Sequence, residues 1–230
     1  MKGFALSSLV PEAPITSAIA TALLQQLRRV EAMWVKQLTD PQSANARVWG
    51  CVAEVALEWS ATIGEVAPGD FAVVQIVTAL PPGTPDNVIA YHTEDDLGRP
   101  LCLISYVAAG SDWPSDCSHE LAECRVDANC SATAKAPDGR TFALEVCDTA
   151  EGSDYEEAGV KVSNAVGPAY FGLAPGPLDI AGIMSEPFQI LPTGYAVVDG
   201  SDIFGAMVPQ TKKDHVLSSH GRPGIRRGKR

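Results

Sequence analysis

Ser118-His119-Glu120-Leu121-Ala122-Glu123 is the stretch from which the rest of this chain is best interpreted. It has the character of a helix. Residues four apart on a helix share a face, so His119 and Glu123 point the same way, with Glu120 beside them. An imidazole and two carboxylates on one helical face can bind a metal ion or move protons. We therefore expect the chemistry of the protein to be centred on this helix.

The spacing is close to the His-Glu-x-x-His motif of zinc hydrolases, in which two histidines hold the metal and the glutamate activates water. Here Glu123 stands where the second histidine would be. A carboxylate is a harder ligand than an imidazole. The motif is therefore compatible with a Zn²⁺ site, with a Ca²⁺ or Mn²⁺ site, and with a site that has lost its metal. The alternative interpretation of the spacing is an exposed helix with a solvated acidic face.

Two further carboxylates follow downstream, in Leu144-Glu145-Val146-Cys147-Asp148. We expect Glu145 to be the third metal ligand. Asp148 is then the carboxylate that orients His119 through its other ring nitrogen. Glu120 is the expected general base, which accepts a proton from water and passes it to a leaving amine.

Length and composition predict a globular protein. The chain has 230 residues, of which 46% are hydrophobic, enough for one sizeable core. No apolar run approaches the length of a bilayer span, and the weakly apolar start is broken by Ser7, Ser8 and Pro11, so we expect neither a membrane helix nor a signal peptide. The six cysteines admit disulfides, but without a signal peptide reduced thiols are expected.

Charge is unevenly distributed along the chain. The net charge is −11, with seven basic residues and one acid, Asp214, from residue 212 onward. A flexible basic tail over residues 210–230 is therefore expected to seek an anionic partner such as DNA; a plain solvated terminus is the alternative. The basic residues of this tail are Lys212, Lys213, Arg222, Arg226, Arg227, Lys229 and Arg230.

The order of elements predicts an α+β fold. Residues 1–14, interrupted by prolines, are expected to form an extended arm, and 15–209 a single domain. A helix should run from Thr16 or Ser17 to Leu38, where apolar residues recur at helical spacing. Strands are expected over 47–59, 71–77, 88–93, 101–107, 141–146, 160–164 and from residue 195, with the 101–107 strand leading into the motif helix.

Two further side chains are candidate substrate contacts. His92 lies in the short 88–93 strand, and Tyr170 lies in an aromatic turn at 167–172. A lone histidine in such a place is more often a satisfied core or surface residue. An aromatic residue in a turn more often serves packing.

Several segments together resemble a largely uncharacterised family of phage and prophage proteins, which is itself similar to zincin metallopeptidases in a Ser-His-Glu helix and a Glu-Val-Cys-Asp strand. The resemblance covers residues 90–175. It implies a zincin-like core, with a mixed or antiparallel sheet, an N-terminal helix and the motif helix. The implied ligands are His119, Glu123 and Glu145, with Glu120 as base. The segments are Tyr91–Thr93, Gly98–Pro100, Ser118–Glu123, Ala143–Asp148, Gly159–Asn164 and Pro168–Phe171.

Two functions from different classes follow from this resemblance. The first is a phage-encoded metallopeptidase-like hydrolase, carried by the virion and acting on a peptide substrate, with zinc as its metal and Ca²⁺ or Mn²⁺ still open. The second is a non-catalytic virion protein of the capsid or tail that uses a degenerate zincin-like domain as scaffold. Its arms would bind other virion proteins or packaged DNA. Either function places the protein in the virion or the cytoplasm of a bacterial host.

Overall fold

The computed structural model describes residues 3–38, 56–59, 71–84, 88–94, 100–128, 130–210 and 213. Within these ranges the protein is a mixed α+β fold with three sheets and two long helices, α1 (Ser17–Leu38) and α3 (Trp113–Asp127). Of the predicted strand over 47–59, only its end lies in the described ranges. Of the seven basic residues of the predicted tail, only Lys213 does.

The larger sheet has the strand order β2-β1-β3-β5-β4. Four of its strands run parallel, and β4 is antiparallel at one edge. The predictions over 71–77, 88–93 and 101–107 are confirmed with small shifts at their ends. The strands are β1 (Gly3–Ser8), β2 (Ala56–Trp59), β3 (Phe71–Val77), β4 (Ala90–Glu94) and β5 (Pro100–Ser105).

The N-terminal segment is not the extended arm that the sequence predicted. Residues 3–8 form β1, which pairs with β2 on one side and β3 on the other. Phe4, Ala5 and Leu6 are all buried, because an internal parallel strand is covered on both faces. The domain therefore begins with β1 rather than at residue 15.

Helix α1 begins where the sequence predicted. The Ile19 amide donates to Thr16 Oγ1 at 3.2 Å, which satisfies one of the free amides of the first turn. Leu23 and Leu27 pack in the core of the larger sheet. Trp34, two turns further on, belongs to a second core in the C-terminal half, so α1 packs against both halves of the molecule.

Helix α3 carries the His-Glu-x-x-Glu motif and is almost entirely buried. The chain enters it from β5 through the short helix α2 (Tyr106–Ala109) and a 3₁₀ turn over Gly110–Asp112. Eleven of the fifteen α3 residues are buried, and Glu120 and Glu123 are only 6% and 4% exposed. The interpretation of the motif as an exposed helix with a solvated acidic face is therefore wrong. Carboxylates at this depth need partners.

The C-terminal half is built from short strands and long turns. The predicted strand over 141–146 already ends at Ala143, so Glu145 and Asp148 lie beyond it, and Asp148 opens the 3₁₀ turn η3 (Asp148–Ala150). The second sheet has the order β11-β10-β7-β6, and β8 and β9 form a hairpin. The strands are β6 (Thr133–Lys135), β7 (Thr141–Ala143), β8 (Tyr155–Glu157), β9 (Val160–Val162), β10 (Tyr195–Val198) and β11 (Ser201–Phe204).

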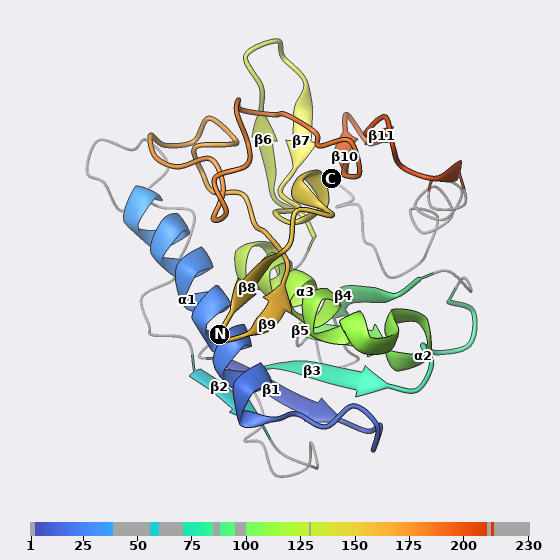
Figure 1. Cartoon of the computed structure of the whole chain (residues 1–230). Coiled ribbons are helices and arrows are strands. Elements are labelled where there is room, and N and C mark those ends of the chain that lie inside the picture. The colour runs from blue at the N-terminus through green and yellow to red at the C-terminus, as the bar shows by residue number, and fades with distance from the viewer. Residues whose placement is uncertain are drawn as a thin grey trace.

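The two halves share α1 and α3. Leu121 and Cys124 of α3 belong to the core of the larger sheet, whereas Ala122 and Val126 belong to the core of the C-terminal half. Helix α3 thus lies between the larger sheet below and the C-terminal half above (Figure 1). The motif is carried at the junction of the two halves.

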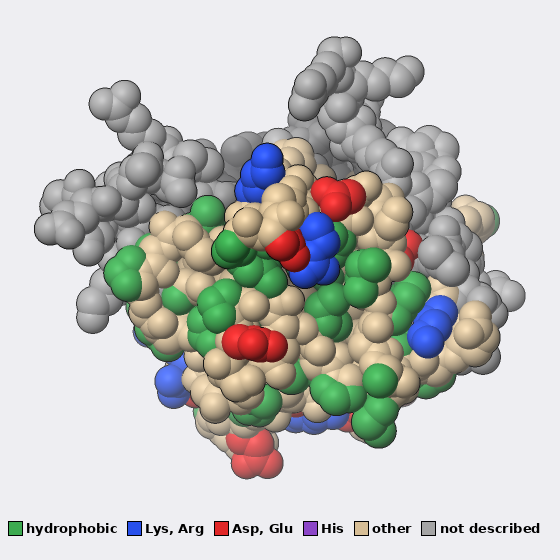
Figure 2. Space-filling view, turned by 90° about the horizontal axis from the view of Figure 1, so that it is seen from above, with side chains coloured by type: hydrophobic (Ala, Val, Ile, Leu, Met, Phe, Trp, Pro, Cys, Tyr) green, Lys and Arg blue, Asp and Glu red, His purple; other side chains and the backbone are tan. Residues whose placement is uncertain are grey.

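Among the described residues, the upper face of the molecule carries no continuous basic surface. Seen from above, acidic and basic side chains are scattered among apolar ones (Figure 2). Within the described residues, this face therefore offers no broad patch on which a nucleic acid would lie.

Candidate metal centre

The motif helix meets two other parts of the chain at one place. Strand β4, which packs against α3, carries His92. The segment after β7 carries Glu145 and Asp148. This segment is held to α3 because the Cys147 amide donates to Glu123 Oε1 at 3.1 Å. Residues far apart in sequence are thus fixed around the buried face of one helix.

The first group of potential ligands surrounds His119. Its Nε2 lies 3.2 Å from Asp148 Oδ1 and 3.3 Å from Glu123 Oε1. The helix supplies the His119–Glu123 pair through its i, i+4 spacing, and η3 supplies Asp148. One ligand atom from each of the three residues lies within 4.8 Å of the other two, so the group can hold a metal ion.

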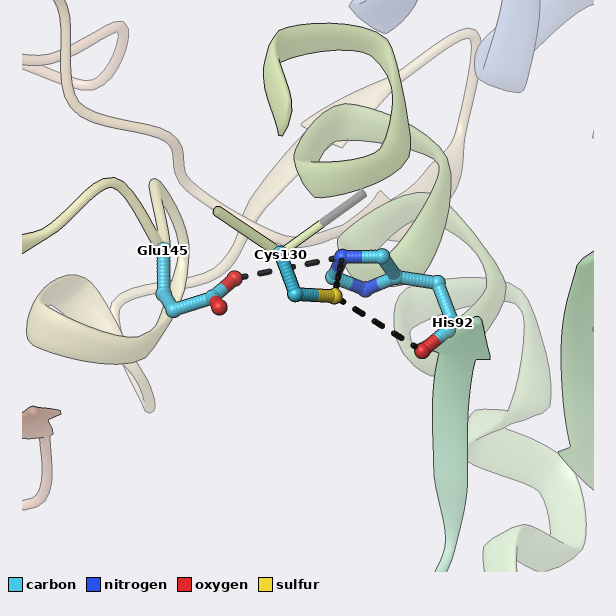
Figure 3. Close-up of side chains that lie close together, drawn as sticks. All are labelled: His92, Cys130 and Glu145. Atoms are coloured by element: carbon cyan, nitrogen blue, oxygen red, sulfur yellow. Dashed lines mark hydrogen bonds and ion pairs between the residues drawn. The ribbon is translucent and has the colours of Figure 1, made fainter. Parts of the chain in front are cut away.

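The second group surrounds His92. Its Nε2 lies 3.0 Å from Cys130 Sγ and 4.0 Å from Glu145 Oε2. Figure 3 shows the thiol and the carboxylate approaching the imidazole from the turn after α3 and from the segment after β7. One ligand atom from each of these three residues also lies within 4.8 Å of the other two, so this group can hold a metal ion as well.

Two carboxylates of α3 lie between these groups. Glu120 Oε2 is 3.0 Å from His92 Nδ1, and Glu123 Oε2 is 3.7 Å from the same nitrogen. The other oxygen of Glu123 faces His119. Glu123 therefore reaches both imidazoles, and the groups form one connected array.

The array shifts the ionisation of its histidines. Burial alone would lower the pKa of His92, but its hydrogen bonds to Cys130 and Glu120 outweigh burial and raise that pKa well above the usual value. Burial likewise opposes charge on His119, and the neighbouring Glu123 and Asp148 carboxylates raise its pKa. The negative charge around both imidazoles thus favours their protonated forms.

Two carboxylates of the array, Glu145 and Asp148, are shifted toward their neutral forms. Burial, reinforced by the charge of Glu123, raises the pKa of Glu145 well above its ordinary value. The same two causes raise the pKa of Asp148. Burial also raises the pKa of the Cys130 thiol, to about 11. Because metal ligands must be deprotonated, binding of a cation here would release protons.

The residues present suit a divalent cation. Oε2 of Glu145 is buried and has no hydrogen-bond partner among the described residues. Four carboxylates surround two imidazoles in this array, and a cation would offset their mutual repulsion. Imidazole nitrogen, carboxylate oxygen and thiolate sulfur are the ligand atoms that zinc accepts.

The expected ligands all lie in one array, but they are divided between two histidines instead of surrounding His119 alone. His119 and Glu123 lie together, as their spacing predicts. Asp148, expected at the other ring nitrogen of His119, instead approaches the same nitrogen as Glu123. Glu145, expected as the third ligand of His119, lies beside His92.

Two members of the site were not expected from the sequence. Cys130 was given no role from the sequence, yet its thiol lies against His92. Tyr195, at the start of β10, hydrogen-bonds Asp148 through its side chain, and burial raises its pKa well above the ordinary value. A cysteine closely following the motif helix was the one available signal for Cys130, and we find none for Tyr195.

The two candidate substrate contacts are both internal. Tyr170 is fully buried in the second core, and its hydroxyl donates to the Gln189 carbonyl oxygen at 2.7 Å. Tyr170 is thus a packing residue, which corrects its assignment as a substrate contact. His92 is buried among the acidic groups described above.

Comparison with known proteins gives no further assignment. No family model matches the chain, and no curated protein or solved structure is significantly similar to it. Among the described residues no helix is long and apolar enough to cross a membrane. The five cysteines that the structure describes are free thiols.

Proposed function

We propose that the protein is a metal-dependent, peptidase-like hydrolase with its centre on α3. The observation that carries this proposal is the convergence of His119, Glu123 and Asp148 at one imidazole nitrogen, with further carboxylates buried around them. Such a concentration of buried ionisable groups is a recognised indication of a functional site. The packing of a mixed sheet against a buried motif helix supports the proposal.

Each of these residues has a distinct part in the proposal. His119, Glu123 and Asp148 would hold the ion, and zinc is our first choice. When bound, such an ion supplies an electrophile that polarises a carbonyl or acidifies water. Glu120 accepts the proton released from water and delivers it to the leaving amine. Its Oε2 is positioned by His92 Nδ1 at 3.0 Å.

The biological setting of the proposal comes from the resemblance to phage proteins. A virion-carried hydrolase would act on host protein or cell-wall peptide, and the basic C-terminal residues would contact packaged DNA or neighbouring subunits. The geometry of the site supports the proposed hydrolytic chemistry and not this biological setting. Purified particles analysed by mass spectrometry test the setting, and absence of the protein from them contradicts it.

The hydrolase proposal is tested with Glu120→Gln. The substitution keeps the shape of the side chain but removes its basicity. We expect the variant to bind metal like the wild type while hydrolysis of a peptide library falls at least about 100-fold. Glu186→Gln, at an exposed position, is the matched control. Unchanged turnover in a metal-loaded Glu120→Gln protein contradicts the proposal.

One observation favours the second function, a non-catalytic scaffold. Glu120 already pairs with His92, and Glu123 already accepts the Cys147 amide. An array in which ionic groups satisfy one another can serve to fix β4, α3 and the segment after β7 together. In that case the wild type hydrolyses no peptide of the library with metal bound, and Glu120→Gln lowers stability.

A further inference from the structure

We propose that His92, Cys130 and Glu145 form a second metal site, selective for zinc, beside the His119 group. This site uses none of the three residues that hold the ion in the proposed function, and it stands whether or not the protein is a hydrolase. Three different parts of the chain build it: edge strand β4, the turn after α3 and the segment after β7.

The distances between the three ligand atoms lie close to those of a zinc site. In a tetrahedral zinc site with the usual bond lengths, ligand atoms are separated by about 3.3–3.6 Å. Here His92 Nε2 lies 3.0 Å from Cys130 Sγ and 4.0 Å from Glu145 Oε2, on either side of that range. Small side-chain rotations would bring all three atoms to bonding distance. Three protein ligands leave a fourth position open.

The ligand set distinguishes this site from its neighbour. A thiolate with an imidazole favours zinc and other borderline or soft ions over calcium, magnesium and manganese. The His119 group contributes one nitrogen and two carboxylate ligands, which discriminate less strongly. We therefore expect the two positions to differ in which metals they accept.

The surroundings of His92 complete the site. Histidine ligands of metals commonly donate their other ring N–H to a carboxylate, which fixes the ring and raises its basicity. Glu120 Oε2 is 3.0 Å from His92 Nδ1, so a proton on Nδ1 leaves Nε2 free to bind metal. On the opposite side, the buried Oε2 of Glu145 lacks a hydrogen-bond partner within the described chain and faces Nε2.

Glu123 connects the two positions. Its Oε1 lies 3.3 Å from His119 Nε2 and its Oε2 lies 3.7 Å from His92 Nδ1. Because Nδ1 faces the α3 carboxylates and Nε2 faces the thiol, the imidazole of His92 separates the two metal positions. Filling the second site would therefore hold Glu120 in place as a hydrogen-bond acceptor next to the first.

The experiment measures zinc per chain in the full-length protein, by mass spectrometry of purified, zinc-equilibrated samples. We expect two zinc ions in the wild type and in Cys117→Ser, a control at a buried thiol on the same helix that lies outside the ligand groups. Cys130→Ser and Glu145→Gln should each hold one ion. Asp148→Asn should also hold one ion, because it loses the ion bound at the His119 group.

Cobalt substitution reports the thiolate directly. Co²⁺ bound to a cysteine thiolate gives a sulfur-to-metal charge-transfer band in the near ultraviolet. The wild type, Asp148→Asn and Cys117→Ser should show this band, and Cys130→Ser should lose it. Retention of the band or of both ions in Cys130→Ser overturns the inference, as does a wild type that binds a single ion through Asp148. Two ions without peptide hydrolysis would instead overturn the proposed function and leave the second site standing.

If Cys130→Ser fails to fold, Glu145→Gln decides the zinc count. Its loss of one ion, with the charge-transfer band weakened or shifted, supports the site. An unchanged zinc count and an unchanged band in Glu145→Gln contradict it.

Discussion

Asp116, one turn before Glu120 on α3, is a residue whose ionisation should affect stability measurably. Burial raises its pKa from an ordinary 3.8 to about 7; His119 opposes this shift, and Glu120 adds to it. At pH values between these two pKa values, the Asp116 carboxyl is deprotonated in the unfolded chain but keeps its proton in the folded protein. Folding is therefore progressively disfavoured as pH rises from about 4 to 7, by at most roughly 4 kcal/mol.

Asp116→Asn should remove this dependence. We expect the variant to resemble the wild type at about pH 3, below both pKa values, where both states carry the proton, and to have a higher free energy of unfolding at about pH 8. Urea unfolding at a series of pH values is the measurement. Asp112→Asn, whose side chain is 64% exposed, is the control. Parallel stability profiles for wild type and Asp116→Asn would contradict the account.

The identity of the ligands could be predicted from sequence only in part. The i, i+4 spacing was sufficient to bring His119 and Glu123 together. Glu145 and Asp148 are only three residues apart, but the chain leaves β7 at Ala143 and turns into η3, so one faces His92 and the other His119. Cys130 contacts His92 from a backbone with a φ of 48°. The residues around it in the sequence do not predict this conformation.

At the scale of elements, the ion pair between α1 and α3 makes a clear prediction. Arg125 Nη2 lies 2.6 Å from Glu31 Oε1, and both side chains are largely buried. Glu31→Ala leaves the guanidinium without this partner, and we expect it to lower the free energy of unfolding by about 3 kcal/mol. Thermal and urea unfolding measure the loss.

A matched comparison separates charge burial from simple truncation. The double variant Glu31→Met, Arg125→Met should recover much of the loss, because it removes both charges. Lys161→Met, which breaks an ion pair with Asp154 from a side chain 51% exposed, should cost less than about 1 kcal/mol. Equal losses in Glu31→Ala and Lys161→Met would contradict the role assigned to the buried pair.

Strand β1 gives the second prediction at this scale. Phe4 is fully buried, whereas Leu9, just beyond the strand, is 55% exposed. Phe4→Ala should lower the free energy of unfolding by about 3–5 kcal/mol, and Leu9→Ala should change it by less than about 0.5 kcal/mol. Chemical denaturation of the two variants distinguishes a core strand from an extended arm. Similar small effects from both would favour the arm.

Elements with strong periodicity were predictable, and β1 was not. The apolar stripe of α1 and the β-branched run of β3 gave both elements nearly to the residue. Strand β1 is six residues long and is closely followed by Pro11 and Pro14, so its local pattern resembles a loop. Only pairing with β2 and β3, which are remote in sequence, makes it a strand.

At the scale of the whole molecule, the candidate metal centre joins the two halves through α3. Ligand groups from β4, α3 and the segment after β7 converge at this junction. A cation that binds only the folded state stabilises it by mass action, by about 2.7 kcal/mol when free metal exceeds the Kd 100-fold. Metal should therefore raise the melting temperature of the entire protein in one transition.

Chelation tests this coupling. Removing metal should lower the melting temperature, and adding Zn²⁺ should restore it. The double variant His92→Ala, His119→Ala should show no response to either treatment. If the double variant responds as strongly as the wild type, the stabilising ion lies elsewhere in the chain.

Anomalous diffraction at the zinc absorption edge, from crystals grown with zinc, is the decisive measurement for metal binding at His119. We expect an anomalous peak about 2.0–2.1 Å from His119 Nε2, between the carboxylates of Glu123 and Asp148. Zinc-loaded crystals with no anomalous peak within bonding distance of His119, or with peaks only at surface residues, would contradict this expectation.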